Sequence, residues 1–119
     1  MAASPSELQA LIARLREFAG ARDWEQFHTP KNLAMALIVE AGELVEHFQW
    51  LTPEQAGRLS PEELQAVELE MADVFLYLLR LADRLDVDLA AAAWRKIEIN
   101  ERKYPADKVR GSARKADEK

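Results

Sequence analysis

The chain has 119 residues, of which 49% are hydrophobic, and its formal net charge is -5 at pH 7. This length and apolar content predict one soluble domain with its own core. The negative charge argues against binding a long nucleic acid, and the absence of cysteine excludes disulfides, thiolate metal sites and cysteine nucleophiles. Neither a signal peptide nor a long uncharged apolar run is apparent, so we expect a cytoplasmic location and no membrane partner.

Helix start signals recur along the chain. Residues 4–7 (SPSE) and 60–63 (SPEE) each combine a capping hydroxyl, a proline at the first helical position and a glutamate at the third. Thr29-Pro30 and Thr52-Pro53 carry the first half of this signal. Together they predict helices over residues 5–20, 30–51, 61–85 and 88–103, with a helical turn after Pro53 and a cap at Asp86 or Asp88.

No segment alternates apolar and polar residues with the period of a strand, so the predicted fold class is all-α, a four-helix bundle. We expect the helical domain to span residues 1–105. Residues 106–119 are small, polar and charged, and are expected to form a flexible tail.

The helix predicted over 30–51 carries two carboxylates inside its apolar stripe. Glu40 and Glu43 share an arc with leucines, and Glu70 and Asp73 repeat this arrangement on the helix over 61–85. If the two stripes face each other, four carboxylates converge, and protons or cations must balance them. Oxygen ligands of this kind suit Mg²⁺, or Mn²⁺ as a substitute.

Two alternatives to this metal site remain. The acidic pairs could be solvated, or matched by Arg80, Arg84 or Lys96. A di-iron site requires Glu-x-x-His on two helices, but His47 is four residues after Glu43 and no second histidine follows Glu70. We therefore disfavour iron and interpret His47 as a supporting or buried structural residue.

Both long helices are also apolar on the side opposite the carboxylates. A helix that is apolar all round is buried all round, which predicts a homodimer or a homotetramer. The alternative is that the first helix covers this second face. The residues concerned are Met35, Ile38, Val45, Phe75, Leu76 and Leu79.

Aromatic and basic residues complete a candidate nucleotide site. Trp24, Phe27 and His28 lie in a predicted connection, Trp50 ends the second helix, and Tyr77 lies one turn beyond Asp73. Such side chains can stack on a nucleobase, although each of them taken singly is more often a core residue. On the last helix Lys96 and Asn100 share the inner arc, where a lysine beside metal-bound carboxylates suits a phosphate. The alternatives are that the Lys96 side chain snorkels to solvent or forms a plain salt bridge. Arg102 and Tyr104 are weaker candidates.

The ordered set of motifs resembles a known family. EAGELVE (40–46) followed by EMADV (70–74) is similar to the paired acidic motifs of the MazG-like all-α nucleoside triphosphate pyrophosphohydrolases, and most of all to the branch that hydrolyses dCTP. The resemblance extends through EFAGARDWEQFHTPKNLAMAL, LVEHFQW, DVFLYLLRLADRLDVDL and NERKYP, over residues 15–105.

The resemblance implies a function and a set of roles. Glu40, Glu43, Glu70 and Asp73 would hold Mg²⁺ on a nucleoside triphosphate while water attacks the α-phosphorus, giving a monophosphate and pyrophosphate. Glu43, with Glu40, would act on that water as the catalytic pair. An interlocked homo-oligomer is implied as well. The residues implied to contact the base and sugar are Trp24, Glu25, Gln26, Phe27, His28, Trp50 and Tyr77, and those implied at the phosphates are Lys96 and Asn100.

One departure concerns specificity. Leu15 stands where close relatives carry a histidine near the base, so the resemblance fixes dCTP, or a modified dCTP, less firmly than the reaction. A relative acting on dUTP or phosphoribosyl-ATP is an alternative, as is a non-catalytic helical interaction module with a structural acidic stripe. The sequence leaves open the base, the sugar, the number of metal ions and the choice between dimer and tetramer.

Overall fold

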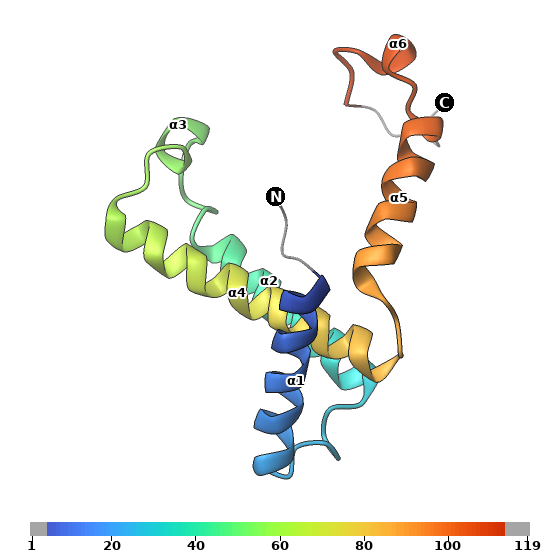
Figure 1. The fold of residues 1–119 in the computed structure, drawn as a ribbon. Coiled ribbons are helices and arrows are strands. Elements are labelled where there is room, and N and C mark those ends of the chain that lie inside the picture. The colour runs from blue at the N-terminus through green and yellow to red at the C-terminus, as the bar shows by residue number, and fades with distance from the viewer. Residues whose placement is uncertain (1–4, 114–119) are drawn as a thin grey trace. The chain divides into compact units, whose positions relative to one another are not determined.

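The computed structural model describes residues 5–113, and its side chains from Glu7 onward (Figure 1). Residues 5–113 contain helices and no strand, which confirms the all-α prediction. The chain divides into two units, Met1–Asp86 and Val87–Lys119. The first contains α1 (Pro5–Ala21), α2 (Pro30–Glu46), α3 (Pro53–Ala56) and α4 (Pro61–Arg84), and the second contains α5 (Leu89–Lys103) and α6 (Ala106–Val109).

The predicted capping residues begin four of these helices. The side chains of Thr29, Thr52, Ser60 and Asp88 each accept a hydrogen bond from the amide three residues later. Thr52 and Ser60 form full capping boxes, because the third residue of each helix returns a hydrogen bond to the cap amide. Asp88 is therefore the cap, and Asp86, with a φ of 57°, lies beyond the end of α4. The cap predicted at Ser4 lies outside the described residues.

One predicted helix end was wrong. The second helix was expected to reach residue 51 but ends at Glu46. Beyond it the amides of His47 and Phe48 bond to carbonyls only three residues back, so the chain tightens into turns before Thr52 and Pro53. In the segment expected to be a tail, residues 106–109 form the short helix α6.

The core of the first unit lies where α2 runs antiparallel along α4, with α1 crossing α4 (Figure 1). Leu33 of α2 and Leu79 of α4 are fully buried there. Arg16 joins α1 to α4 through a bidentate pair with Asp83, Nε to Oδ2 at 2.8 Å and Nη2 to Oδ1 at 2.5 Å. The packing of α2 along α4 holds the two helices that carry the candidate carboxylates side by side.

The second apolar face is only partly covered. Leu79 is buried and Leu76 is half-buried, whereas Met35, Ile38 and Val45 of α2 are each more than half exposed. Packing within the chain therefore leaves an apolar strip along α2, and the oligomer stays a prediction. None of the described helices is long and apolar enough to cross a membrane.

Candidate metal centre and adjoining pocket

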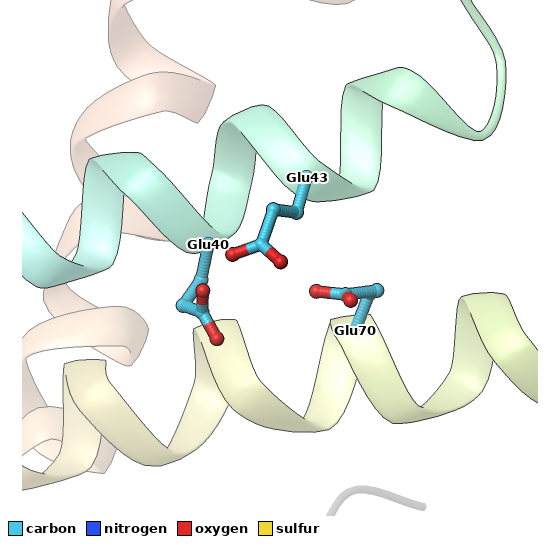
Figure 2. A group of neighbouring side chains, drawn as sticks. All are labelled: Glu40, Glu43 and Glu70. Atoms are coloured by element: carbon cyan, nitrogen blue, oxygen red, sulfur yellow. The ribbon is translucent and has the colours of Figure 1, made fainter.

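The carboxylates of Glu40, Glu43 and Glu70 meet between α2 and α4, and we call these three residues the acidic group. Glu40 and Glu43 are three residues apart and so project from one side of α2, while Glu70 projects from the facing side of α4 (Figure 2). One oxygen of each lies within 4.8 Å of the others. This is the spacing that oxygen ligands of one cation can adopt.

The electrostatics of this acidic group favour binding of a cation. The pKa of Glu40 is raised to about 7 by its hydrogen bond with Glu43, by desolvation, and by repulsion from Glu43, Asp73 and Glu70. The Oε2 atom of Glu70 is buried without a hydrogen-bond partner, which is costly for an acceptor. An oxygen-only donor set with an unsatisfied buried atom fits a hard divalent cation such as Mg²⁺ or Mn²⁺.

Asp73 stands apart from the other three predicted ligands. It is not among the carboxylates that converge within 4.8 Å. Its charge nevertheless contributes to the raised pKa of Glu40, so it lies close to the group. Asp73 also lines the neighbouring cavity, and so connects the acidic group to that cavity.

This cavity, of about 460 Å³, opens between α1 and α4. Its α1 wall is apolar and is formed by Leu11, Leu15 and Phe18, with Arg14 beside them. The spacing of four and three residues places the three apolar side chains on one face of α1. The volume lies in the range of small-molecule pockets.

The opposite wall carries the polar groups. Asp73, Tyr77 and Arg80 line it from α4, while Trp24 and His28 line it from the connection between α1 and α2. Trp24 packs edge-on against Phe18, with ring centroids 5.6 Å apart, and lies 6.0 Å from the ring of His28. Three predicted base-contacting residues, Trp24, His28 and Tyr77, are thus brought together in one pocket.

Four other predicted contacts do not line this pocket. Glu25 pairs with Arg80 and Arg84, and Gln26 donates a hydrogen bond to the Asp23 carboxylate. Phe27 is exposed in the connection. Trp50 is 86% exposed, because α2 ends before it and the following turns direct it away from the core.

Of the remaining predicted residues, two belong to the second unit and His47 belongs to the first. Lys96 and Asn100 are exposed on α5, in the second unit. Their assignment to the phosphates stays a prediction. His47 is half-buried at the C-terminal end of α2 and is not part of the acidic group.

Sequence reasoning missed Arg80, treating it only as a possible salt-bridge partner. It is 4% exposed, lines the pocket and contacts Glu25, His28 and Asp83. A signal was present, because Arg80 follows Asp73 by seven residues and Tyr77 by three, and so shares their face of the helix. The predicted face was defined from the position of Glu70, and it did not include Arg80.

Comparison with known proteins finds close relatives. Residues 35–118 match the MazG-like family. Over 115 residues, 94% of this chain, the sequence is 50% identical to dCTP pyrophosphatase 1 of Homo sapiens, and over 105 residues it is 50% identical to that of Bos taurus. The chain spans 68% and 62% of the lengths of these two proteins.

A solved structure is similar as well. The crystal structure of a pyrophosphatase from Archaeoglobus fulgidus matches with a TM-score of 0.70 and 41% identity, covering 88% of this chain and 98% of that one. These likenesses confirm the predicted resemblance and the predicted enzyme class, nucleotide pyrophosphohydrolase. The chain belongs to the MazG-like family.

Proposed function

We propose that the chain hydrolyses a deoxynucleoside triphosphate, dCTP or a modified dCTP, to the monophosphate and pyrophosphate in a Mg²⁺-dependent reaction. The observation that carries this proposal is the convergence of Glu40, Glu43 and Glu70, with the Oε2 atom of Glu70 buried and unpartnered. The substrate is suggested by the names of the relatives, each a dCTP pyrophosphatase 1. The cytoplasm is the proposed location.

The acidic group has a defined role in this proposal. Glu40, Glu43 and Glu70, with Asp73 beside them, would hold Mg²⁺ or Mn²⁺. When bound, such an ion offsets phosphate charge and makes the α-phosphorus more electrophilic. Glu43, with Glu40, then orients the attacking water and accepts its proton.

The pocket supplies binding and orientation. Trp24 and Tyr77 offer flat faces to a base, and the apolar wall of Leu11, Leu15 and Phe18 excludes water from it. Asp73 lies both near the acidic group and in the pocket, so a ligand in the pocket can extend a polyphosphate toward the carboxylates. Lys96 and Asn100 are proposed as phosphate contacts.

The proposal includes a homo-oligomer, either a dimer or a dimer of dimers. Its support is the exposed apolar strip of Met35, Ile38 and Val45, which runs along the same helix that carries Glu40 and Glu43. Burying it against a second copy removes this surface from water. The ligand-bearing helix would then be packed on both sides.

The test is a panel of the four deoxynucleoside triphosphates and dUTP with Mg²⁺, with products identified by ³¹P NMR. We expect release of pyrophosphate and not orthophosphate, fastest from dCTP, and no reaction in excess EDTA. Glu40→Gln should lower kcat/KM at least about 100-fold. Glu68→Gln, on an exposed position of α4, is the matched control and should retain activity.

Three outcomes would contradict the proposal. Orthophosphate as the first product would assign a different cleavage. Equal activity of Glu40→Gln and Glu68→Gln would remove the acidic group from the reaction. No turnover of any triphosphate, with no change in melting temperature on adding Mg²⁺ and nucleotide, would favour the non-catalytic interaction module.

A further inference from the structure

Arg80 is the one charged side chain that is buried among the described residues. It lies on α4 in the wall of the pocket, and three partners surround its guanidinium. Nη2 pairs with the Glu25 carboxylate, and Nη1 donates to Oδ2 of Asp83 at 3.4 Å. Nε donates to Nδ1 of His28 at 3.2 Å. Glu25 and His28 belong to the connection, so Arg80 ties this connection to α4.

The hydrogen bond to His28 defines where the imidazole carries its proton. A guanidinium has five N–H donors, has no acceptor and stays protonated. Nδ1 of His28 must therefore present its lone pair, and in the neutral ring the proton resides on Nε2. A protonated ring would direct a second N–H against Arg80. In agreement, desolvation and then the charge of Arg80 lower the pKa of His28.

The other charges around His28 come from two elements. Glu25, in the same connection, favours the protonated ring, and Arg84 on α4 disfavours it, as Arg80 does. The carboxylate of Glu25 is itself shared between these two arginines. The surroundings of the ring thus carry two guanidinium groups and one carboxylate, which together keep it neutral.

Within the described part of the chain, the Nε2 atom of His28 has no hydrogen-bond partner. Yet His28 is only half-buried, and it lines the pocket together with Trp24 and Tyr77. The apolar side chains of the α1 wall offer no hydrogen bond to the polar edge of a ligand, and Arg14 beside them is exposed and paired with Glu17. The Nε2–H group of His28 is therefore a fixed donor in a largely apolar cavity.

We infer that Arg80 is a positioning residue for substrate recognition: by binding Nδ1 of His28, it fixes the Nε2–H tautomer and presents that donor to an acceptor atom on the substrate's base. This inference rests on the proposed function. The acceptor class is a carbonyl oxygen or an unprotonated ring nitrogen. Glu25 and Asp83 hold the guanidinium in the orientation that this hydrogen bond requires.

The first experiment reads the proton directly. The chain has two histidines, so long-range ¹H–¹⁵N correlation spectra at pH 7.5, assigned with His47→Gln, report the tautomer of His28. We expect a neutral Nε2–H ring in the wild type and in Glu25→Gln, which keeps the donor Nε of Arg80 and an acceptor oxygen for its Nη2. Arg80→Met should give a mixture of tautomers. A wild-type ring protonated on Nδ1, or a spectrum unchanged in Arg80→Met, overturns the inference.

The second experiment separates positioning from a purely structural role. Arg80→Met and His28→Ala should each raise KM for dCTP about tenfold, with a smaller effect on kcat. In the His28→Ala background, Arg80→Met should change KM less than about twofold, because its target is gone. Multiplicative effects on KM, tracking a fall in melting temperature in both backgrounds, would assign Arg80 a structural role only. If no triphosphate is hydrolysed, the proposed function fails, and the spectra alone decide the assignment.

Discussion

The repulsion in the acidic group should be measurable as a pH-dependent loss of stability in the metal-free protein. The perturbation is Glu40→Gln, which keeps the shape of the side chain and removes its charge. The pKa of Glu40 is 4.5 in the ordinary case and about 7 in the folded chain. Between these values the folded state holds a proton that the unfolded state has lost, so wild-type stability falls as pH rises through this window.

The size of the stability difference follows from the change in the pKa of Glu40 on folding. A change from 4.5 to about 7 corresponds to about 3 kcal/mol at 1.36 kcal/mol per pKa unit. Glu40 is half-buried, so water and ions screen part of the repulsion, and we expect about 1–2 kcal/mol. Above pH 7 in EDTA, Glu40→Gln should therefore be the more stable protein by this amount, and at pH 4 the two should be equal.

The assay is urea unfolding at fixed protein concentration and at several pH values from 4 to 8.5, with and without Mg²⁺. Glu46→Gln, an exposed glutamate of α2, is the matched control and should follow the wild type. Mg²⁺ should stabilise the wild type at pH 8 more than it stabilises Glu40→Gln. A stability difference between wild type and Glu40→Gln that stays constant with pH, or a less stable Glu40→Gln at pH 8 in EDTA, would refute the reasoning.

Three further predictions concern an ion pair, a helix cap and the proposed oligomer interface. Asp83→Asn should lower the free energy of unfolding measured in urea at pH 7, since it removes the carboxylate that pairs with Arg16 and with the buried Arg80. Because Arg16 lowers the pKa of Asp83, this difference should shrink as pH falls through that pKa, and a constant difference would contradict it. Ser60→Ala removes a capping box and should cost about 1 kcal/mol, whereas Ser60→Asp, which keeps an acceptor, should cost less. Ile38→Glu should lower the mass measured by light scattering, with the exposed Lys31→Gln as control, and an unchanged mass would exclude this strip from the interface.

The parts of the fold that could be predicted are those that depend on interactions between residues close together in the sequence. Thr29, Thr52, Ser60 and Asp88 cap helices because a short polar side chain reaches an amide three residues ahead, and this depends on neighbouring residues only. The end of α2 could not be predicted from the sequence in this way. The residues after Glu46 continue the apolar pattern of the helix, while the choice between helix and turn depends on how the chain reaches Pro53.

The acidic group could be predicted from local sequence patterns, whereas most of the pocket could not. Glu40, Glu43 and Glu70 could be predicted because a carboxylate within an apolar stripe is visible in one helix at a time. The network of Arg80 with Glu25 and His28 joins residues more than fifty positions apart, and no local pattern pairs them. The α1 wall of the pocket was missed because Leu11 and Phe18 look like ordinary core residues.

The ties that Arg80 makes also bear on how the chain resists proteases. The segment between α1 and α2 contains exposed residues such as Phe27 and would ordinarily open locally at little cost. Here cleavage requires breaking a buried guanidinium away from Glu25 and His28. The rate of chymotryptic cleavage after Trp24 or Phe27 therefore gives a simple measure of pocket integrity, one that needs neither substrate nor metal.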